Sequence, residues 1–123
     1  MSIKNRQICI EKICSLPVNF KLENKSAWTL AKESNFSDLY STISAQDIKE
    51  FLQRHSHLIE KWIIWSEGKR TVGNYLLISE NKFIIGALDE NIKKIFEKEY
   101  ETAIDACSEF VLIEVAAILN IKL

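Results

Sequence analysis

Glycine and proline are scarce in this chain of 123 residues, which contains three glycines and one proline. The glycines, Gly68, Gly73 and Gly86, are too far apart to form the glycine-rich loop that cradles nucleotide phosphates. The sequence also lacks a Gly-x-Ser-x-Gly segment, which exposes the serine nucleophile of many hydrolases. These absences argue against dinucleotide, ATP and serine-hydrolase sites of the familiar kinds.

Cysteine and histidine are few as well. The three cysteines, Cys9, Cys14 and Cys107, are odd in number and form no Cys-x-x-Cys pair, so we expect buried, reduced thiols rather than a disulfide framework. His55 and His57 lie two positions apart and would point about 200° away from each other on a helix, so they would not share a metal ion. The sequence therefore predicts no catalytic residue, metal or cofactor, and we expect a protein that is not an enzyme.

Neither sign of charge is in excess. Sixteen Lys and Arg against seventeen Asp and Glu leave a formal net charge of −1. This balance supplies none of the broad attraction to phosphate that nucleic-acid-binding proteins usually carry. Direct binding of nucleic acid is therefore not expected.

Long apolar runs are also missing. The longest, at residues 110–119, contains Glu114 and is shorter than the roughly 20 residues that span a membrane. Near the N-terminus, Glu11 and Lys12 interrupt the apolar positions that a secretion signal would need. We expect a cytoplasmic protein without a membrane partner.

What the chain does have is the composition of an ordinary folded domain, with 47% hydrophobic and 27% charged residues. Its length suits one compact core. We expect a single α+β domain over residues 1–123, with several helices packed on a β-hairpin or a short antiparallel sheet.

The N-terminal half reads mainly as helix. The apolar pattern of residues 6–15 is compatible with a short helix, whereas the alternation at 18–22, after the only proline, predicts a short edge strand. Ser26 can cap a brief second helix, and a polar connection follows at 35–42. Ser44 and Asp47 then resemble a capping box that opens a helix predicted at 45–66.

The C-terminal half begins with two β-rich runs, 75–79 and 82–88, which flank a two-residue loop and predict a β-hairpin. Asp89 is predicted to cap a final helix that extends to residue 118. Carboxylates recur every four residues along this expected helix. They form an acidic stripe of Glu97, Glu101, Asp105 and Glu109.

Two interpretations of this acidic stripe remain open. Like charges at this spacing repel by about 0.2–0.5 kcal/mol per pair in an isolated helix. The plainer interpretation is a solvated face that Lys94 and Lys98 partly neutralise. However, Asp105 and Glu109 have no Lys or Arg within four residues on the same helix. An uncompensated acidic ridge would steer a basic partner toward it.

A second candidate contact lies where the 45–66 helix leads into the hairpin, at Trp65, Glu67 and Arg70. Trp and Arg are the residue types that dominate interface hot spots. The alternative is structural: Trp62 and Trp65 seal the core while the basic residues after Gly68 complement the negative end of the helix dipole.

These features together resemble the small immunity proteins that bacteria encode beside polymorphic toxins, including those of contact-dependent growth inhibition. The resemblance is carried by the small, slightly acidic, motif-free chain, the segment WIIWSEGKRTVGNYLLI before the hairpin, and the acidic stripe. It implies a protein that binds the C-terminal domain of its cognate toxin, commonly a basic nuclease, and covers its active site. Carboxylates then take the place of nucleic-acid phosphates.

Two other functions stay open from the sequence. One is a small ligand-binding or regulatory domain, with a pocket between the hairpin and the long helix lined by Trp62, Tyr75 and Phe83. The other is an enzyme of an unrecognised type.

Overall fold

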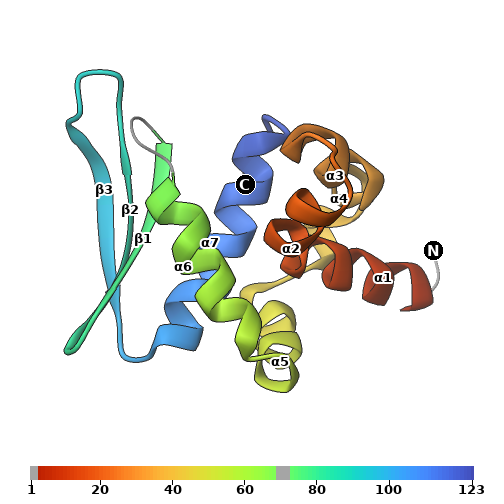
Figure 1. Cartoon of the computed structure of the whole chain (residues 1–123), viewed down its shortest axis with the longest axis horizontal. Helices are drawn as coiled ribbons and strands as arrows, with labels where there is room; N and C mark the ends of the chain where they lie inside the picture. The colour runs from red at the N-terminus through yellow and green to blue at the C-terminus, as the bar shows by residue number, and fades with distance from the viewer. Residues whose placement is uncertain (1–2, 69–72) are drawn as a thin grey trace.

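The fold is described by a computed structural model that covers residues 3–68 and 73–123 (Figure 1). In these residues helices precede and follow a three-stranded antiparallel sheet, which confirms the predicted α+β class. The elements are α1 (Ile3–Cys14), α2 (Leu16–Leu22), α3 (Ala27–Glu33), α4 (Phe36–Leu39), the 3-10 helix η1 (Tyr40–Thr42), α5 (Ala45–Arg54), α6 (His57–Gly68), β1 (Gly73–Ser79), β2 (Lys82–Leu88), β3 (Lys94–Tyr100) and α7 (Ala103–Ile118).

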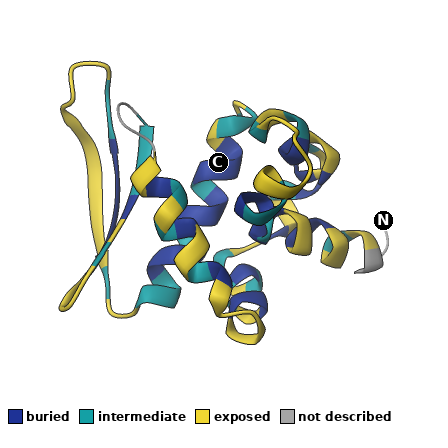
Figure 2. Ribbon diagram, in the orientation of Figure 1, coloured by how far each residue is buried: buried dark blue, intermediate teal, exposed yellow. Residues whose placement is uncertain are grey.

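Helix α7 is the centre of the molecule. It contacts α1, α3, α5, α6 and all three strands, and Figure 1 shows it between the sheet and the N-terminal helices. Nine of its sixteen residues are buried, as the dark colouring in Figure 2 indicates, and the stripe of Glu109, Ile113 and Ala117 is partly open. A helix with so wide an apolar surface is stable in water only when other elements cover that surface. The rest of the chain provides that cover.

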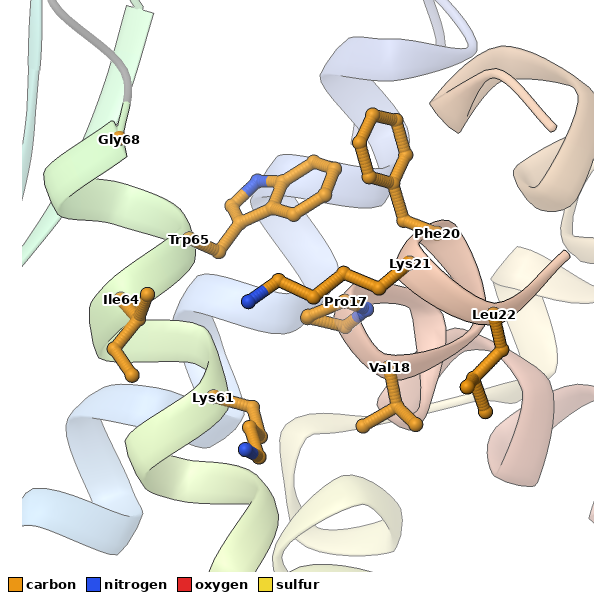
Figure 3. A pocket seen from close by; sticks show the side chains of 9 residues that line it. All are labelled: Pro17, Val18, Phe20, Lys21, Leu22, Lys61, Ile64, Trp65 and Gly68. Carbon is orange, nitrogen blue, oxygen red and sulfur yellow. The ribbon is translucent and has the colours of Figure 1, made fainter. Parts of the chain in front are cut away.

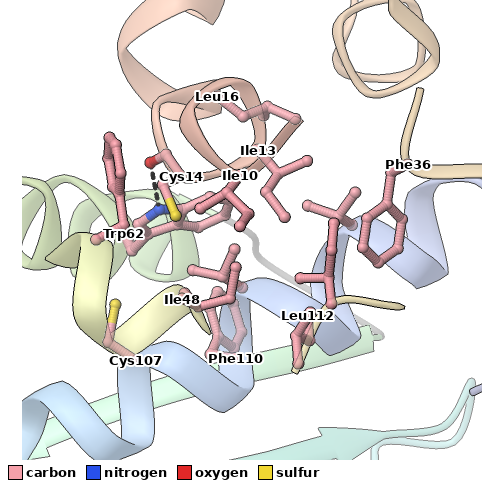
Figure 4. Close-up of a cluster of buried hydrophobic side chains, with 14 of the residues drawn as sticks. Ile10, Ile13, Cys14, Leu16, Phe36, Ile48, Trp62, Cys107, Phe110 and Leu112 are labelled. Atoms are coloured by element: carbon pink, nitrogen blue, oxygen red, sulfur yellow. Dashed lines mark hydrogen bonds between the residues drawn. The ribbon is translucent and has the colours of Figure 1, made fainter. Parts of the chain in front are cut away.

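The core joins α7 to the N-terminal helices through Trp62 of α6 (Figure 4). The Trp62 side chain is fully buried, and its Nε1–H donates a hydrogen bond of 2.8 Å to the carbonyl oxygen of Cys14 at the end of α1. Its ring meets Phe110 of α7 edge-on, with 5.9 Å between the ring centroids. A buried indole N–H left without this acceptor would cost about 1–3 kcal/mol, so the contact fixes how α1 and α6 meet.

The three cysteines are buried free thiols, as the sequence predicts. Burial raises the pKa of Cys9 to about 11 and that of Cys107 to about 12. Burial also raises the pKa of Cys14. The thiolate is the reactive form of cysteine, so these residues act as small apolar side chains at neutral pH.

The sheet has the order β1-β2-β3, and its first two strands form the predicted hairpin. One face, with Leu76 and Ile85, packs on α6 and α7. On the opposite face the side chain of Leu77 is 52% exposed. There the ring of Tyr75 lies across Gly86, where a Cβ atom would collide with it.

The predicted strand at 18–22 is wrong, because these residues belong to helix α2. Pro17 lies at the start of this helix rather than ending the preceding one. Proline is favoured in the first turn of a helix, since its fixed φ suits the helix and its missing N–H would have no partner there. The alternation of Val18, Phe20 and Leu22 therefore does not mark the two faces of a strand. Phe20 and Leu22 are both exposed.

Two other connections also differ from expectation. The polar segment 35–42 contains the short helices α4 and η1. The helix predicted at 45–66 is divided into α5 and α6, since the backbone of His55 leaves the helical region with φ −136° and ψ 54°. The capping box at its start is confirmed: Ser44 and Asp47 bond each other's backbone N–H groups.

The predicted final helix from Asp89 is wrong over its first part, where residues 94–100 form β3. The Asp89 carboxylate accepts hydrogen bonds from the backbone N–H groups of Asn91 and Lys93, which closes a turn instead of capping a helix. Ile92 in that turn has φ 62°, in the left-handed region. The turn leads the chain back along the free edge of β2, and strand pairing overrides the helical periodicity.

Ile92 gives a stability prediction. The other three non-glycine residues with positive φ in the described parts of the chain are all asparagines, which tolerate this conformation, whereas a β-branched residue is strained there. Strain of this kind costs about 1–3 kcal/mol. Because the Ile92 side chain is 69% exposed, Ile92→Asn loses little burial. We expect it to raise the free energy of unfolding in urea by about 0.5–1 kcal/mol.

The matched control is Ile95→Asn on β3, where isoleucine is also exposed and lies at a bulge in the pairing with β2, but its φ is not positive. That variant should lower the free energy of unfolding, because asparagine is unfavourable in strands. Equal effects of the two substitutions would contradict strain at residue 92.

Candidate functional site

The four carboxylates of the acidic stripe do not lie on one helix. Glu97 is on β3, Glu101 is in the turn after it, and Asp105 and Glu109 are on α7. The hydroxyl of Tyr75 donates a 2.8 Å hydrogen bond to Glu97, and the Lys94 ammonium lies 3.0 Å from it. The Tyr75 hydrogen bond, followed by that from Lys94, lowers the pKa of Glu97. Glu97 is thus a paired residue on the open face of the sheet.

The other three carboxylates come together around a cleft of about 360 Å³ between α5, β3 and α7, which we call the acidic cleft. The turn 101–102 is short, so the chain reverses from β3 into α7 and brings the end of the strand beside the first turns of the helix. Helix α5 closes the third side. The charged and aromatic side chains around the cleft include Lys49, Lys98, Tyr100, Glu101, Asp105 and Glu109.

Asp105 is compensated, which corrects the expectation from the sequence. Lys49 of α5 lies 2.8 Å from its carboxylate, and the Thr102 hydroxyl donates a 2.7 Å hydrogen bond to it. The Lys49 contact, followed by the Thr102 hydrogen bond, lowers the pKa of Asp105. Thr102 in turn accepts from the backbone N–H of Asp105 and caps α7. Asp105 therefore holds the fold together as well as lining the cleft.

Glu101 and Glu109 are different, because neither has an ion-pair partner among the residues that the structure describes. Glu101 is exposed and Glu109 is half-buried. On β3, the Lys98 ammonium lies 5.0 Å from the centre of the Tyr100 ring, a cation–π contact. The unpaired negative charge of the predicted stripe is thus concentrated on two residues.

Tyr100 adds a polar group that the sequence did not indicate. Its hydroxyl oxygen is buried and finds no hydrogen-bond partner among the described residues. Burial raises the pKa of Tyr100 to about 12, and the negative charges of Glu109 and Asp105 contribute. Buried hydroxyls usually have a partner in a folded protein. Tyr100 lines the acidic cleft, so this buried orphan hydroxyl is an unused hydrogen-bonding group close to a hollow in the surface.

The residues of the second candidate contact differ in their surroundings. Trp65 is half-buried, and its Nε1–H donates a 2.8 Å hydrogen bond to the buried carboxylate of Glu114 on α7. Its ring also meets Trp62 edge-on. The structural interpretation of Trp65 is therefore confirmed. Glu67 is exposed near the end of α6, and Arg70 lies outside the described residues.

The pocket expected between the hairpin and the long helix is not formed by the residues proposed for it. Trp62 has no exposed surface. Phe83 packs against the core, whereas the side chain of Tyr75 lies on the opposite face of the sheet and reaches Glu97.

A different hollow, of about 560 Å³, lies between α2 and α6 (Figure 3), and we call it the apolar groove. The sequence pattern does not reveal this groove, because the alternation at 18–22 predicts a strand. Interpreted as a helix that begins near Pro17, the same segment places Phe20 and Lys21, which lie three and four positions after Pro17, on one face with that proline.

No known protein family, curated protein or solved structure matches this chain. Within residues 3–68 and 73–123, no three His, Cys, Asp or Glu side chains are arranged to hold a metal ion. Nor does any helix in those ranges have the length and apolar character needed to cross a membrane.

The orphan hydroxyl gives a pH prediction. Since Tyr100 has an ordinary pKa of 10.0 when unfolded and about 12 when folded, its contribution to stability is complete below pH 10. It is lost as the pH rises toward 12, because only the unfolded chain then releases the proton. Tyr100→Phe should therefore reduce the alkaline loss of stability. At pH 7 it should be neutral or stabilising by about 1 kcal/mol, since it removes an unpaired buried hydroxyl.

Urea unfolding at pH 7 and between pH 10 and 12 measures both effects. Tyr40→Phe removes a tyrosine hydroxyl outside the acidic cleft and serves as the control. Clear destabilisation by Tyr100→Phe at pH 7 would mean that the hydroxyl has a partner after all.

Proposed function

We propose that this protein is an immunity protein, which binds a cognate protein toxin in the cytoplasm and neutralises it by covering its active site. The observation that carries the proposal is the acidic cleft, where unpaired carboxylates surround an orphan hydroxyl. A small domain of this kind acts by presenting a surface, and the acidic cleft is a polar surface with binding groups that the fold itself leaves unused.

The charge of the acidic cleft favours a basic partner. Glu101 and Glu109 line the same cleft as Asp105, which already neutralises Lys49. Even with Lys98 in the lining, the carboxylates leave an excess of negative charge, which attracts lysine and arginine side chains and raises the rate of association. A nuclease is a suitable target, since its active site is built to receive phosphates, and carboxylates can occupy the same positions.

The orphan hydroxyl favours a specific complex over loose charge attraction. The Tyr100 side chain lines the cleft with Asp105 and Glu109, and its hydroxyl oxygen is buried. A partner that opens the cleft and hydrogen-bonds this oxygen would satisfy it, and a partner lacking such a group would leave it unpaired. A buried group without a partner costs about 1–3 kcal/mol, which is enough for discrimination among related toxins.

The second candidate contact is retained in a reduced form. Glu67 is exposed on α6, away from the acidic cleft, and it is available to a partner large enough to reach both surfaces. Trp65 and Arg70 carry less of the proposal, since Trp65 is held within the molecule by Glu114.

The binding test is charge reversal at the two unpaired carboxylates. We expect Glu101→Lys with Glu109→Lys to leave the fold intact and to weaken toxin binding at least tenfold, since like charges in an interface cost several kcal/mol and about 1.4 kcal/mol is a factor of about ten. Most of the loss should appear in the association rate at low salt. Surface plasmon resonance at two ionic strengths measures it.

The matched control is Glu11→Lys with Glu60→Lys, which changes the net charge equally at exposed positions on α1 and α6. This variant should bind nearly as the parent protein does. If both double variants weakened binding equally, the loss would come from the change in overall charge. That result would contradict the acidic cleft as the binding site. Asp105 is left unchanged, because its contacts with Lys49 and Thr102 stabilise the fold.

Function is tested by toxicity. The protein encoded next to this one in its genome is expressed alone and together with it. We expect growth arrest in the first case and growth in the second. A neighbour that is harmless, or one whose toxicity this protein does not relieve, would contradict the proposed function.

A further inference from the structure

The apolar groove between α2 and α6 shares no residue with the acidic cleft, which carries the proposed function, and shares only Trp65 with the second candidate contact. Large apolar side chains line it from both helices, and three of them are exposed: Phe20 by 43%, Leu22 by 76% and Ile64 by 46%. Single exposed apolar residues are common on protein surfaces, but several around one hollow usually mark a binding site. The shape, charge and size of the groove indicate the kind of molecule that fits it.

The groove is shaped before any ligand arrives. Trp65 forms one wall, and its indole N–H is fixed by the hydrogen bond to the buried Glu114 carboxylate. Phe20 meets the Trp65 ring edge-on, with 5.3 Å between centroids and an angle of 90°. Pro17 stiffens the start of α2 at the opposite wall (Figure 3). A rigid apolar wall loses little conformational entropy on binding.

The charge around the apolar groove has one sign. Lys21 from α2 and Lys61 from α6 both line it, and none of its described lining residues is acidic. Figure 3 shows the Lys21 side chain extended across the groove toward α6. Neither lysine has an ion-pair partner among the described residues. Two free ammonium groups over an apolar hollow are complementary to a molecule with an apolar body and a negative end.

The size of the groove favours a small molecule. Its volume of about 560 Å³ lies within the range of roughly 300–1,000 Å³ that is usual for small-molecule sites. Helix α2 has seven residues, about two turns. Such a short wall gives a docked protein helix few successive anchor positions, whereas it can cover a single flexible chain.

From these observations we propose that the apolar groove binds a single-chain amphiphile with an anionic head group, of the class of fatty acids with about twelve or more carbons. The acyl chain packs against Phe20, Ile64 and Trp65. The carboxylate pairs with the ammonium groups of Lys21 and Lys61.

The test compares amphiphiles of equal chain length. Dodecanoate and dodecyltrimethylammonium are titrated below their micelle concentrations into the full-length protein by isothermal calorimetry. We expect dodecanoate to bind at least about tenfold more tightly, since only its head group is complementary to the lysines. Lys21→Glu with Lys61→Glu should reverse this preference. Equal affinity for the two amphiphiles, or no binding of dodecanoate, would overturn the proposal.

Location is tested with one substitution and a matched control. Ile64→Asp places a carboxylate in the groove three residues after Lys61. It should weaken dodecanoate binding by at least about tenfold, since it removes an apolar contact, repels the bound carboxylate and competes for Lys61. Ile8→Asp changes an isoleucine of similar exposure, 39%, on α1 outside the groove and should have no effect. Circular dichroism confirms that both variants fold. Equal effects of the two would place the ligand elsewhere.

Two further measurements distinguish a fatty-acid groove from a membrane-surface site and from the acidic cleft. Binding to vesicles of phosphatidylglycerol without binding of free dodecanoate would identify a membrane-surface site and overturn the proposal. The variant Glu101→Lys with Glu109→Lys should bind dodecanoate as the parent protein does, because those residues lie in the acidic cleft. The fatty-acid proposal can therefore be disproved while the proposed immunity function stands. The immunity function can likewise be disproved without affecting the fatty-acid proposal.

Discussion

The burial of most of the surface of α7 is the constraint on which the rest of the structure depends. Nine of its residues are buried, including a carboxylate, and the helix would be insoluble on its own. The three strands, helices α1 and α3, and helices α5 and α6 all contact α7 and together cover its apolar surface. The buried Glu114 fixes part of this arrangement, since it accepts a hydrogen bond from Trp65 and lies within 3.5 Å of the Asn74 amide nitrogen on β1. A carboxyl group this deep tolerates few other arrangements of its neighbours.

Both candidate surfaces follow from that packing. The acidic cleft forms where α5 and β3 meet the first turns of α7, and the apolar groove forms where α2 leans against the α6 helix that Glu114 anchors. One surface is polar and negatively charged, and the other is apolar with a positive border. Their chemical contrast suits two different kinds of molecule, and their separation allows each to be altered without the other.

Elements whose signals are local could be predicted from the sequence. The Ser44–Asp47 capping box, the Ser26 cap and the hairpin loop all depend on residues within a few positions of each other, and all three are confirmed. The class of fold followed from the same patterns. Buried cysteines could also be predicted, because free cysteine is among the residue types most often found in protein interiors.

The errors have a common physical origin in contacts between distant residues. Residues 94–100 have a periodicity that suits a helix, yet they form a strand because they pair with the free edge of β2. Asp105 looked unpaired because its partner Lys49 lies on another helix. In the candidate site, three of the four predicted carboxylates do meet, but around a cleft rather than along a stripe. The Tyr100 hydroxyl gave no signal at all, since burial of one atom depends on the whole fold.

Gly86 has a consequence for how this sequence can vary. Because glycine has no side chain, the Tyr75 ring can lie across residue 86. Its hydroxyl then reaches Glu97 on β3. A larger residue at position 86 would force that ring away and leave Glu97 with only Lys94 as a partner. The side chain of Tyr75 on β1 thus crosses β2 at Gly86 and links β1 to β3. In evolution, replacement of the glycine should be accompanied by a smaller residue in place of the tyrosine, so that the two positions change together.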